Sequence, residues 1–90
     1  MSRAEVQSLI EQCKAARDSG VSSEHIRTAI LPEAIDRALR RMGAGEFLEW
    51  VRDDREFAYF YHDAQASGVC AKPREAAAFI LEQIAMDAIE

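Results

Sequence analysis

The stretch EFLEWVRDDREFAYFYHDAQA, residues 46–66, contains six of the seven aromatic side chains of this 90-residue chain. These aromatic residues are Phe47, Trp50, Phe57, Tyr59, Phe60 and Tyr61. The segments on either side are rich in Ala, Leu and Ile instead. Because aromatic rings bury more apolar surface than most other side chains, we expect residues 46–66 to nucleate the hydrophobic core.

Two helices are predicted within this stretch. The first spans residues 46–52, because Phe47, Trp50 and Val51 follow one another at i, i+3 and i+4. The second is expected to end at Gly68, since glycine favours the left-handed conformation that terminates helices. The inner face of this second helix is predicted to consist of Phe57, Phe60, Tyr61 and Ala64.

Two helix starts have the spacing of a capping box, in which a short polar side chain precedes a glutamate by three residues. Ser2 and Glu5 are predicted to open the first helix of the chain in this way. Asp53 and Glu56 have the same spacing before the second aromatic helix, although the neighbouring Asp54 is an equally suitable cap.

The residues before the aromatic stretch also have helical periodicity. An apolar stripe predicts a helix over residues 3–18, ended by Gly20 in the left-handed conformation. The stripe consists of Val6, Leu9, Ile10, Cys13 and Ala16. Ser22 stands between apolar residues at the positions of a hydrophobic staple, so we expect it to cap a short helix over residues 23–30.

Proline and glycine mark the next boundaries. Leu31-Pro32 is predicted to break the short helix, because the residue before a proline is disfavoured in the α region. Pro32 then suits the first turn of a third helix. The buried stripe of that helix is Ile35, Ala38, Leu39 and Met42. A tight corner at residues 43–45, Gly-Ala-Gly, is expected to end it.

The last predicted helix follows Pro73 and spans residues 74–89. Its apolar face consists of Ala77, Ile80, Leu81, Ile84, Ala85 and Ala88, with Phe79 on the flank. This face is wider than a monomer of this size needs, which suggests packing against another subunit. Since no stretch alternates with period two, we predict an all-α fold. It should be a single domain over residues 1–90, a compact bundle of five or six short helices with helix-turn-helix-like connections.

Composition excludes several classes of protein. The longest apolar run is six residues, 76–81, whereas a membrane span needs roughly 20. We therefore expect no membrane contact and a cytoplasmic location, with Cys13 and Cys70 reduced. The net charge of −5 is uneven, because residues 1–42 sum to +1 (seven basic, six acidic) and residues 43–90 to −6 (four basic, ten acidic). Any DNA contact is accordingly expected from residues 1–42.

Side chains able to do chemistry are scattered along the chain. His25 and His62 lack the neighbouring ligands that a zinc site requires. Cys13 lies on an apolar stripe, and Cys70 has no His or Asp/Asn partner nearby in the sequence. The acidic residues of segment 46–56 are most simply explained as a solvated helix junction. We therefore expect no enzymatic activity, no cofactor, no metal and no small-molecule substrate.

Two surfaces are candidate binding sites. Arg37, Arg40 and Arg41 share a helix face at i, i+3 and i+4, with Arg27 nearby, and form the patch best able to grip phosphate. Three arginines at this spacing are more often simply the solvated side of an amphipathic helix. The aromatic run 57–61 wraps more than half of its helix, so we expect part of it to be exposed or covered by a partner. The alternative is that these rings only pack in the core of a small domain. The predicted protein-interface residues are Trp50, Tyr59, Phe60, Phe79 and Ile84.

The segment WVRDDREFA at residues 50–58, followed by Tyr61 and Ala64 and then by ILEQIAMD at residues 80–87, resembles the second half of phage terminase small subunits. Those proteins often read W-L-x-x-D-x-x-F, then Tyr and Ala at helical spacing, then an acidic helix with I-L-E-x-I-A-D. The resemblance implies an N-terminal helix-turn-helix that binds viral DNA and later helices that assemble a ring for the packaging motor.

Two functions are therefore expected. The first is a non-catalytic helical module that binds another macromolecule, self-associates and resembles the DNA-packaging adaptor. The alternative is a small acidic regulator or inhibitor that docks its aromatic and acidic surface onto a single protein partner.

Overall fold

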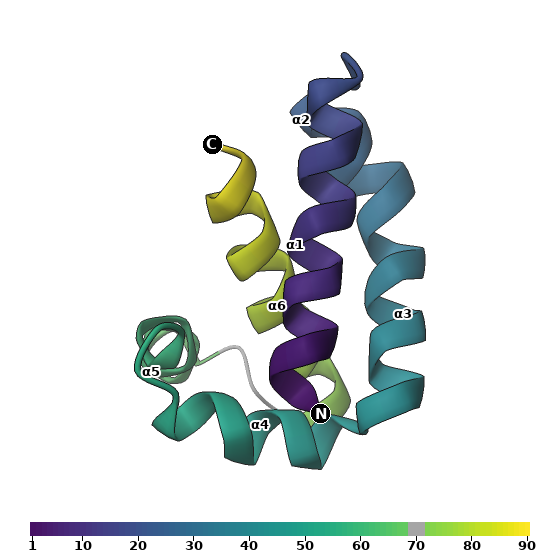
Figure 1. Cartoon of the computed structure of the whole chain (residues 1–90). Coiled ribbons are helices and arrows are strands. Elements are labelled where there is room, and N and C mark those ends of the chain that lie inside the picture. Colours follow the sequence, from purple (N-terminus) through teal and green to yellow (C-terminus); the bar gives the residue numbers. More distant parts are fainter. Residues whose placement is uncertain (69–71) are drawn as a thin grey trace.

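Helices form every regular element in the part of the chain that the computed structural model describes, residues 1–68 and 72–90 (Figure 1). In order, they are α1 (Ser2–Asp18), α2 (Ser23–His25), the π-helical turn η1 (Ile26–Ile30), α3 (Leu31–Met42), α4 (Ala44–Asp53), α5 (Ala58–Ala66) and α6 (Pro73–Ile89). The predicted all-α bundle is confirmed. Its radius of gyration, 12.3 Å, matches the value of about 12 Å expected for a compact chain of this length.

The end of α1 follows the prediction, whereas its start does not. Gly20 has φ +94°, and the amide of Val21 donates to the carbonyl of Ala16 at 3.1 Å, which closes the helix with a left-handed residue. The predicted capping box at Ser2 is wrong. Ser2 already belongs to the helix and is buried, with no capping hydrogen bond, because it lies one turn before Val6 on the same buried stripe.

The predicted break at Leu31-Pro32 is also wrong, because the backbone stays helical from α2 to α3. Ser22 caps this segment as expected, accepting from the amide of His25 at 3.1 Å. The helix then widens over η1, where the amide of Leu31 donates to the carbonyl of Ile26, five residues earlier. A proline ring clashes with the carbonyl four residues before it in a regular α-helix, so a wider turn just before Pro32 lets the helix continue.

A single residue, Gly43, turns the chain from α3 into α4. Its φ of +78° and ψ of 141° lie in a region that glycine alone tolerates well. Ala44 and Gly45, predicted to belong to the corner, are the first residues of α4. Because the turn is so short, α4 leaves α3 abruptly and crosses beneath one end of α1 and α3, which run antiparallel side by side (Figure 1).

Asp54, rather than Asp53, organises the corner between α4 and α5. Its carboxylate accepts hydrogen bonds from the amides of Glu56 at 3.0 Å and Phe57 at 3.1 Å. The same carboxylate binds the guanidinium of Arg3 at 2.5 Å, and this guanidinium lies 5.6 Å from the ring centroid of Trp50. Asp54 thus ties the start of α1 to a corner more than fifty residues away. The prediction that Asp53 or Asp54 caps α5 is wrong, because a turn at residues 55–57 comes between: the N-cap residue is Phe57, and no side chain caps the helix.

The core is built mainly from aliphatic side chains around α6, which contacts α1, α3, α4 and α5. The broad apolar face of α6, which suggested a second subunit, is largely covered by these four helices. Of the six rings in residues 46–66, only Phe47 and Phe57 are buried in the core. The aromatic stretch therefore supplies the rim of the core more than its centre, because α4 and α5 lie at one end of the bundle (Figure 1).

Candidate functional site

The structure divides the predicted arginine patch into two parts. Arg37 and Arg41, four residues apart on α3, line a cavity against α1, whereas Arg40 binds the carboxylate of Asp36 at 2.5 Å. Asp36 also binds Arg74 of α6 at 2.7 Å, so Arg40 faces away from the cavity toward that ion-pair network. Arg37 and Arg40 also line a neighbouring hollow with Asp36 and Arg74, so Arg37 stands between the two parts, and only Arg40 and Arg41 share no hollow.

Arg27 lies apart from the other arginines. Its guanidinium hydrogen-bonds to Glu24 at 2.5 and 2.7 Å, and this hydrogen bond, with the charge of Glu24, raises the pKa of Arg27. Ten residues separate Arg27 from Arg37, which corresponds to about 15 Å along a helix. The expected contribution of Arg27 to a common phosphate patch is therefore not supported.

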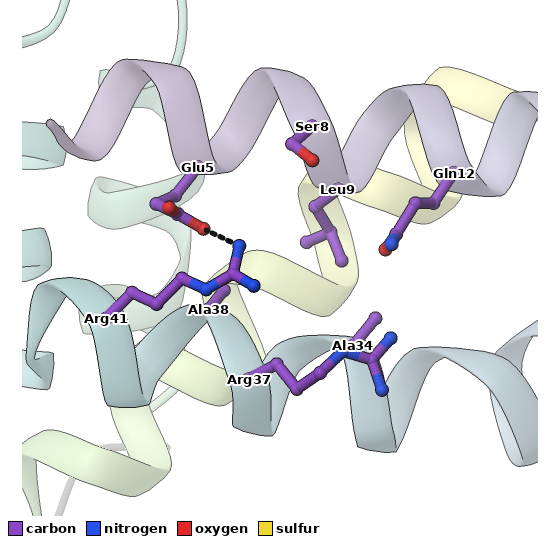
Figure 2. Close-up of a pocket in the computed structure, with 8 residues that line it drawn as sticks. All are labelled: Glu5, Ser8, Leu9, Gln12, Ala34, Arg37, Ala38 and Arg41. Atoms are coloured by element: carbon purple, nitrogen blue, oxygen red, sulfur yellow. Dashed lines mark ion pairs between the residues drawn. The ribbon is translucent and has the colours of Figure 1, made fainter.

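The cavity between α1 and α3 has a volume of about 40 Å³ and is shown in Figure 2. We call it the α1–α3 cavity. Its polar wall on α1 consists of Glu5, Ser8 and Gln12, and its floor of Leu9, Ala34 and Ala38. Arg37 and Arg41 reach up to it from α3 (Figure 2). The cavity exists because the methyl groups of the two alanines fill less of the space between the helices than longer side chains would.

Charges in the α1–α3 cavity are only partly matched. Arg41 forms an ion pair with Glu5 at a long 3.7 Å (Figure 2). Arg37 makes no ion pair with any residue in the ranges 1–68 and 72–90, although it lies at the end of the cavity near Gln12. The cavity thus holds two positive charges and one negative charge.

A second hollow, here called the α5–α6 groove, lies between those helices and encloses about 230 Å³. Its residues are Tyr59, Phe60, Asp63, Gln83, Met86, Asp87 and Glu90. Tyr59 is 71% exposed and stands edge-on against Phe60, with the ring centroids 5.6 Å apart. Two predicted interface residues, Tyr59 and Phe60, are therefore brought together with Met86 and a set of three carboxylates.

The remaining predicted interface residues lie elsewhere. Trp50 is half-buried between Phe47 and Phe57 and beneath the guanidinium of Arg3. Phe79 is half-buried and lines a hollow between α3 and α6. Ile84 is 2% exposed, so its assignment to an interface is wrong: it faces the bundle interior from the central helix.

Groups that could support catalysis lie apart from one another. His25 and His62 are exposed, and the imidazole of His62 packs edge-on against Tyr61. Burial raises the pKa of the Cys13 thiol, which disfavours the reactive thiolate. Cys70 lies outside the described residues. Among residues 1–68 and 72–90, no three His, Cys, Asp or Glu side chains are grouped so that they could hold a metal ion.

The helices of residues 1–68 and 72–90 include none with the length and apolar character required to cross a bilayer. No family model, curated protein or solved structure matches this chain. The surfaces described above are therefore the basis for inferring what the chain binds.

Sequence reasoning missed the α1 side of the α1–α3 cavity and the α6 side of the α5–α6 groove. Ser8 and Gln12 stand at i and i+4 on α1, a spacing that places them on one helix face. That signal was available, but it does not reveal which helix the face meets. Met86 and Asp87 likewise become part of a groove only because α5 packs against α6, which the sequence does not reveal.

Proposed function

We propose that this chain is a non-catalytic binding module whose partner is a protein, held through a basic segment at the α5–α6 groove. The observation that carries the proposal is Tyr59, which is 71% exposed. Its ring lies over a groove that also contains Phe60 and Met86. Tyrosine is enriched among the residues that dominate binding energy, because it combines apolar area with a hydrogen-bonding hydroxyl.

The chemistry of the groove suits a basic partner. Asp63, Asp87 and Glu90 place three carboxylates around the aromatic and methionine surface. Opposite charges at the rim of an interface increase the rate of association and select the partner. A Lys- or Arg-rich segment could lay the apolar part of its side chains on the Tyr59 ring and bring its charged ends to these carboxylates. This arrangement agrees with the alternative of a small acidic regulator.

A DNA-packaging adaptor that self-associates is the second candidate. It is supported by the resemblance to terminase small subunits and by Arg37, which forms no ion pair with the residues described, 1–68 and 72–90. By analogy the helix with Trp50, α4, would read DNA. The exposed residues of α4 include Glu46, Glu49 and Asp53, whose charges oppose a phosphate backbone. For this reason we rank the protein-binding function first.

Site-specific photocrosslinking tests the leading proposal. A photoreactive amino acid at position 59 should give one discrete protein adduct in cells of the native host, and the adduct should survive nuclease treatment. The same group at the exposed position 14 of α1 serves as the control and should not give that adduct. Combining Asp63→Asn with Asp87→Asn should abolish the adduct at position 59. An adduct that persists in this double variant, or that also forms at position 14, would contradict the proposal.

The second candidate is tested separately with purified protein. Replacing Arg37, Arg40 and Arg41 by Glu should abolish retention of duplex DNA at low salt if the chain is a packaging adaptor. Light scattering at tens of micromolar should then also show an oligomer. If the protein is a strict monomer and does not retain DNA, the packaging function is excluded and only the protein-binding function remains.

A further inference from the structure

We propose that the α1–α3 cavity is a binding site for a single phosphate group, either inorganic phosphate or the terminal group of a phosphomonoester. This site is distinct from the α5–α6 groove and goes beyond the proposed function. It joins Arg37 and Arg41 of α3 to Ser8 and Gln12 of α1 over a floor of small apolar side chains.

The donors converge from both walls. Arg37 and Arg41 stand one helical turn apart, so their guanidinium groups project onto the same side of α3. Each guanidinium offers five N–H donors, and neither donates a hydrogen bond to a side chain in the described ranges 1–68 and 72–90. The hydroxyl of Ser8 and the amide of Gln12 face them across the seam (Figure 2).

The local charge favours an anion in spite of Glu5. Glu5 is held at the Arg41 end of the cavity, and Arg37 lies toward the other end, near Gln12 (Figure 2). The ion pair of Glu5 with Arg41 is 3.7 Å long, so Arg41 has donors to spare for a ligand. Arginine binds phosphate especially well because its planar fork matches two phosphate oxygens at once.

The size of the cavity selects one phosphate rather than a nucleic-acid backbone. Its volume of about 40 Å³ admits about three water-sized atoms, at roughly 10–15 Å³ each. A phosphate group at the end of a molecule presents three acceptor oxygens. A duplex instead presents a row of phosphates that must be contacted together along a groove. Arg40 does not line this cavity and is paired with Asp36, so it adds little free positive charge for the row of cations that a duplex would need.

Titration followed by NMR tests the site directly. Inorganic phosphate and phenyl phosphate are each added to the protein at constant ionic strength, with sodium chloride as the reference salt. Saturable shifts are expected for the side-chain amide of Gln12, the backbone amide of Ser8 and the Nε–H of Arg37. Arg37→Gln should weaken binding by about tenfold or more, the usual effect of losing one hydrogen bond between charged groups.

Arg40→Gln is the matched control, since it makes the same charge change on the same helix but outside the cavity. It should alter phosphate affinity by no more than about twofold if the contribution is only distant electrostatics. A Gln12→Ala variant provides a second test that leaves the cations in place and should weaken binding severalfold. Urea unfolding of each variant confirms that the fold is intact.

The two ligands distinguish the sources of the phosphate. Binding of both would support recognition of the phosphate group itself, and tighter binding of phenyl phosphate would indicate a phosphomonoester. The proposal would be overturned by the absence of saturable shifts, or by equal weakening in Arg37→Gln and Arg40→Gln. A third result would also overturn it: a DNA duplex without terminal phosphates binds through Arg37, and neither inorganic phosphate nor phenyl phosphate binds.

Discussion

Replacing Asp54 by alanine is expected to destabilise the protein more than any other single change of a charged residue in the structure described. The carboxylate accepts two backbone amides, those of Glu56 and Phe57, and also binds Arg3. The side chain of Asp54 is 6% exposed, whereas that of Arg3 is 50% exposed. The three interactions therefore differ in how much they stabilise the fold.

The magnitude follows from these environments. Losing the hydrogen bond from the amide of Glu56 costs about 1 kcal/mol, and leaving the buried amide of Phe57 without its charged partner costs about 1–3 kcal/mol more. The ion pair with Arg3 adds at most about 1 kcal/mol, because half of Arg3 is in water. We expect Asp54→Ala to lower the free energy of unfolding by about 3 kcal/mol, which corresponds to roughly 12–24 °C in Tm for a domain of this size.

Urea denaturation provides the assay, read by fluorescence and by circular dichroism. Trp50 is the only tryptophan and lies beside the Arg3 guanidinium, so its emission reports on this corner directly. Asp53→Ala is the matched control. Asp53 is 72% exposed in its side chain, so its loss should change stability by less than about 0.5 kcal/mol.

Two further results would decide the reasoning. Arg3→Ala should cost about 1 kcal/mol, since it removes the exposed ion pair and the contact with Trp50 but leaves the two backbone hydrogen bonds that Asp54 accepts. If Asp54→Ala and Asp53→Ala proved equally mild, the corner would not depend on the buried carboxylate, and the long-range link from α1 to α5 would be refuted.

Three other predictions concern the core, a turn and a thiol. Phe57→Ala should lower the free energy of unfolding by about 3–5 kcal/mol, measured in urea, because the ring is 5% exposed; a near-neutral result would mean that the ring is not packed as described. Gly43→Ala should cost about 1–3 kcal/mol through its φ of +78° alone, as an added Cβ meets nothing within 4 Å; an unchanged melting temperature would contradict this strain. Burial raises the pKa of Cys13 in the folded state, so the folded protein binds more protons than the unfolded chain at alkaline pH, and stability should fall as pH rises beyond the ordinary range of a thiol. Cys13→Ala should flatten that slope in parallel unfolding measurements, whereas an identical slope would exclude Cys13 as its source.

The local sequence pattern predicted correctly those features that depend on a single helix. The apolar stripe of α1, the cap at Ser22 and the stop at Gly20 were all predicted, because each depends on residues within one or two turns. The failures at Ser2 and Pro32 have a common cause: packing against other helices stabilises an extra residue of α1 and a continuous α2–α3 segment that local preference disfavours.

The candidate sites could be predicted only in part for the same reason. The sequence shows that Arg37 and Arg41 share a helix face and that Tyr59 cannot be buried together with all its aromatic neighbours. The sequence also places Asp36 four residues before Arg40 on one helix, a spacing that allows their ion pair. It does not show that Arg74 joins them, because that contact comes from a different helix. The two walls of the α1–α3 cavity and of the α5–α6 groove likewise come from separate helices.

The sequence by itself determined that this protein is helical, where most helices end, and that its negative charge lies in the second half. These properties arise from hydrophobic period, cap residues and composition, which act over a few residues at a time. The tertiary structure alone decided that Asp54 and not Asp53 is the buried carboxylate of the corner between α4 and α5, and that Ile84 faces the core. It alone brought Ser8 and Gln12 opposite Arg37. Such pairings depend on the direction in which each short turn sends the next helix. Where two neighbouring side chains have the same local preference, the contacts between helices decide which of them is buried.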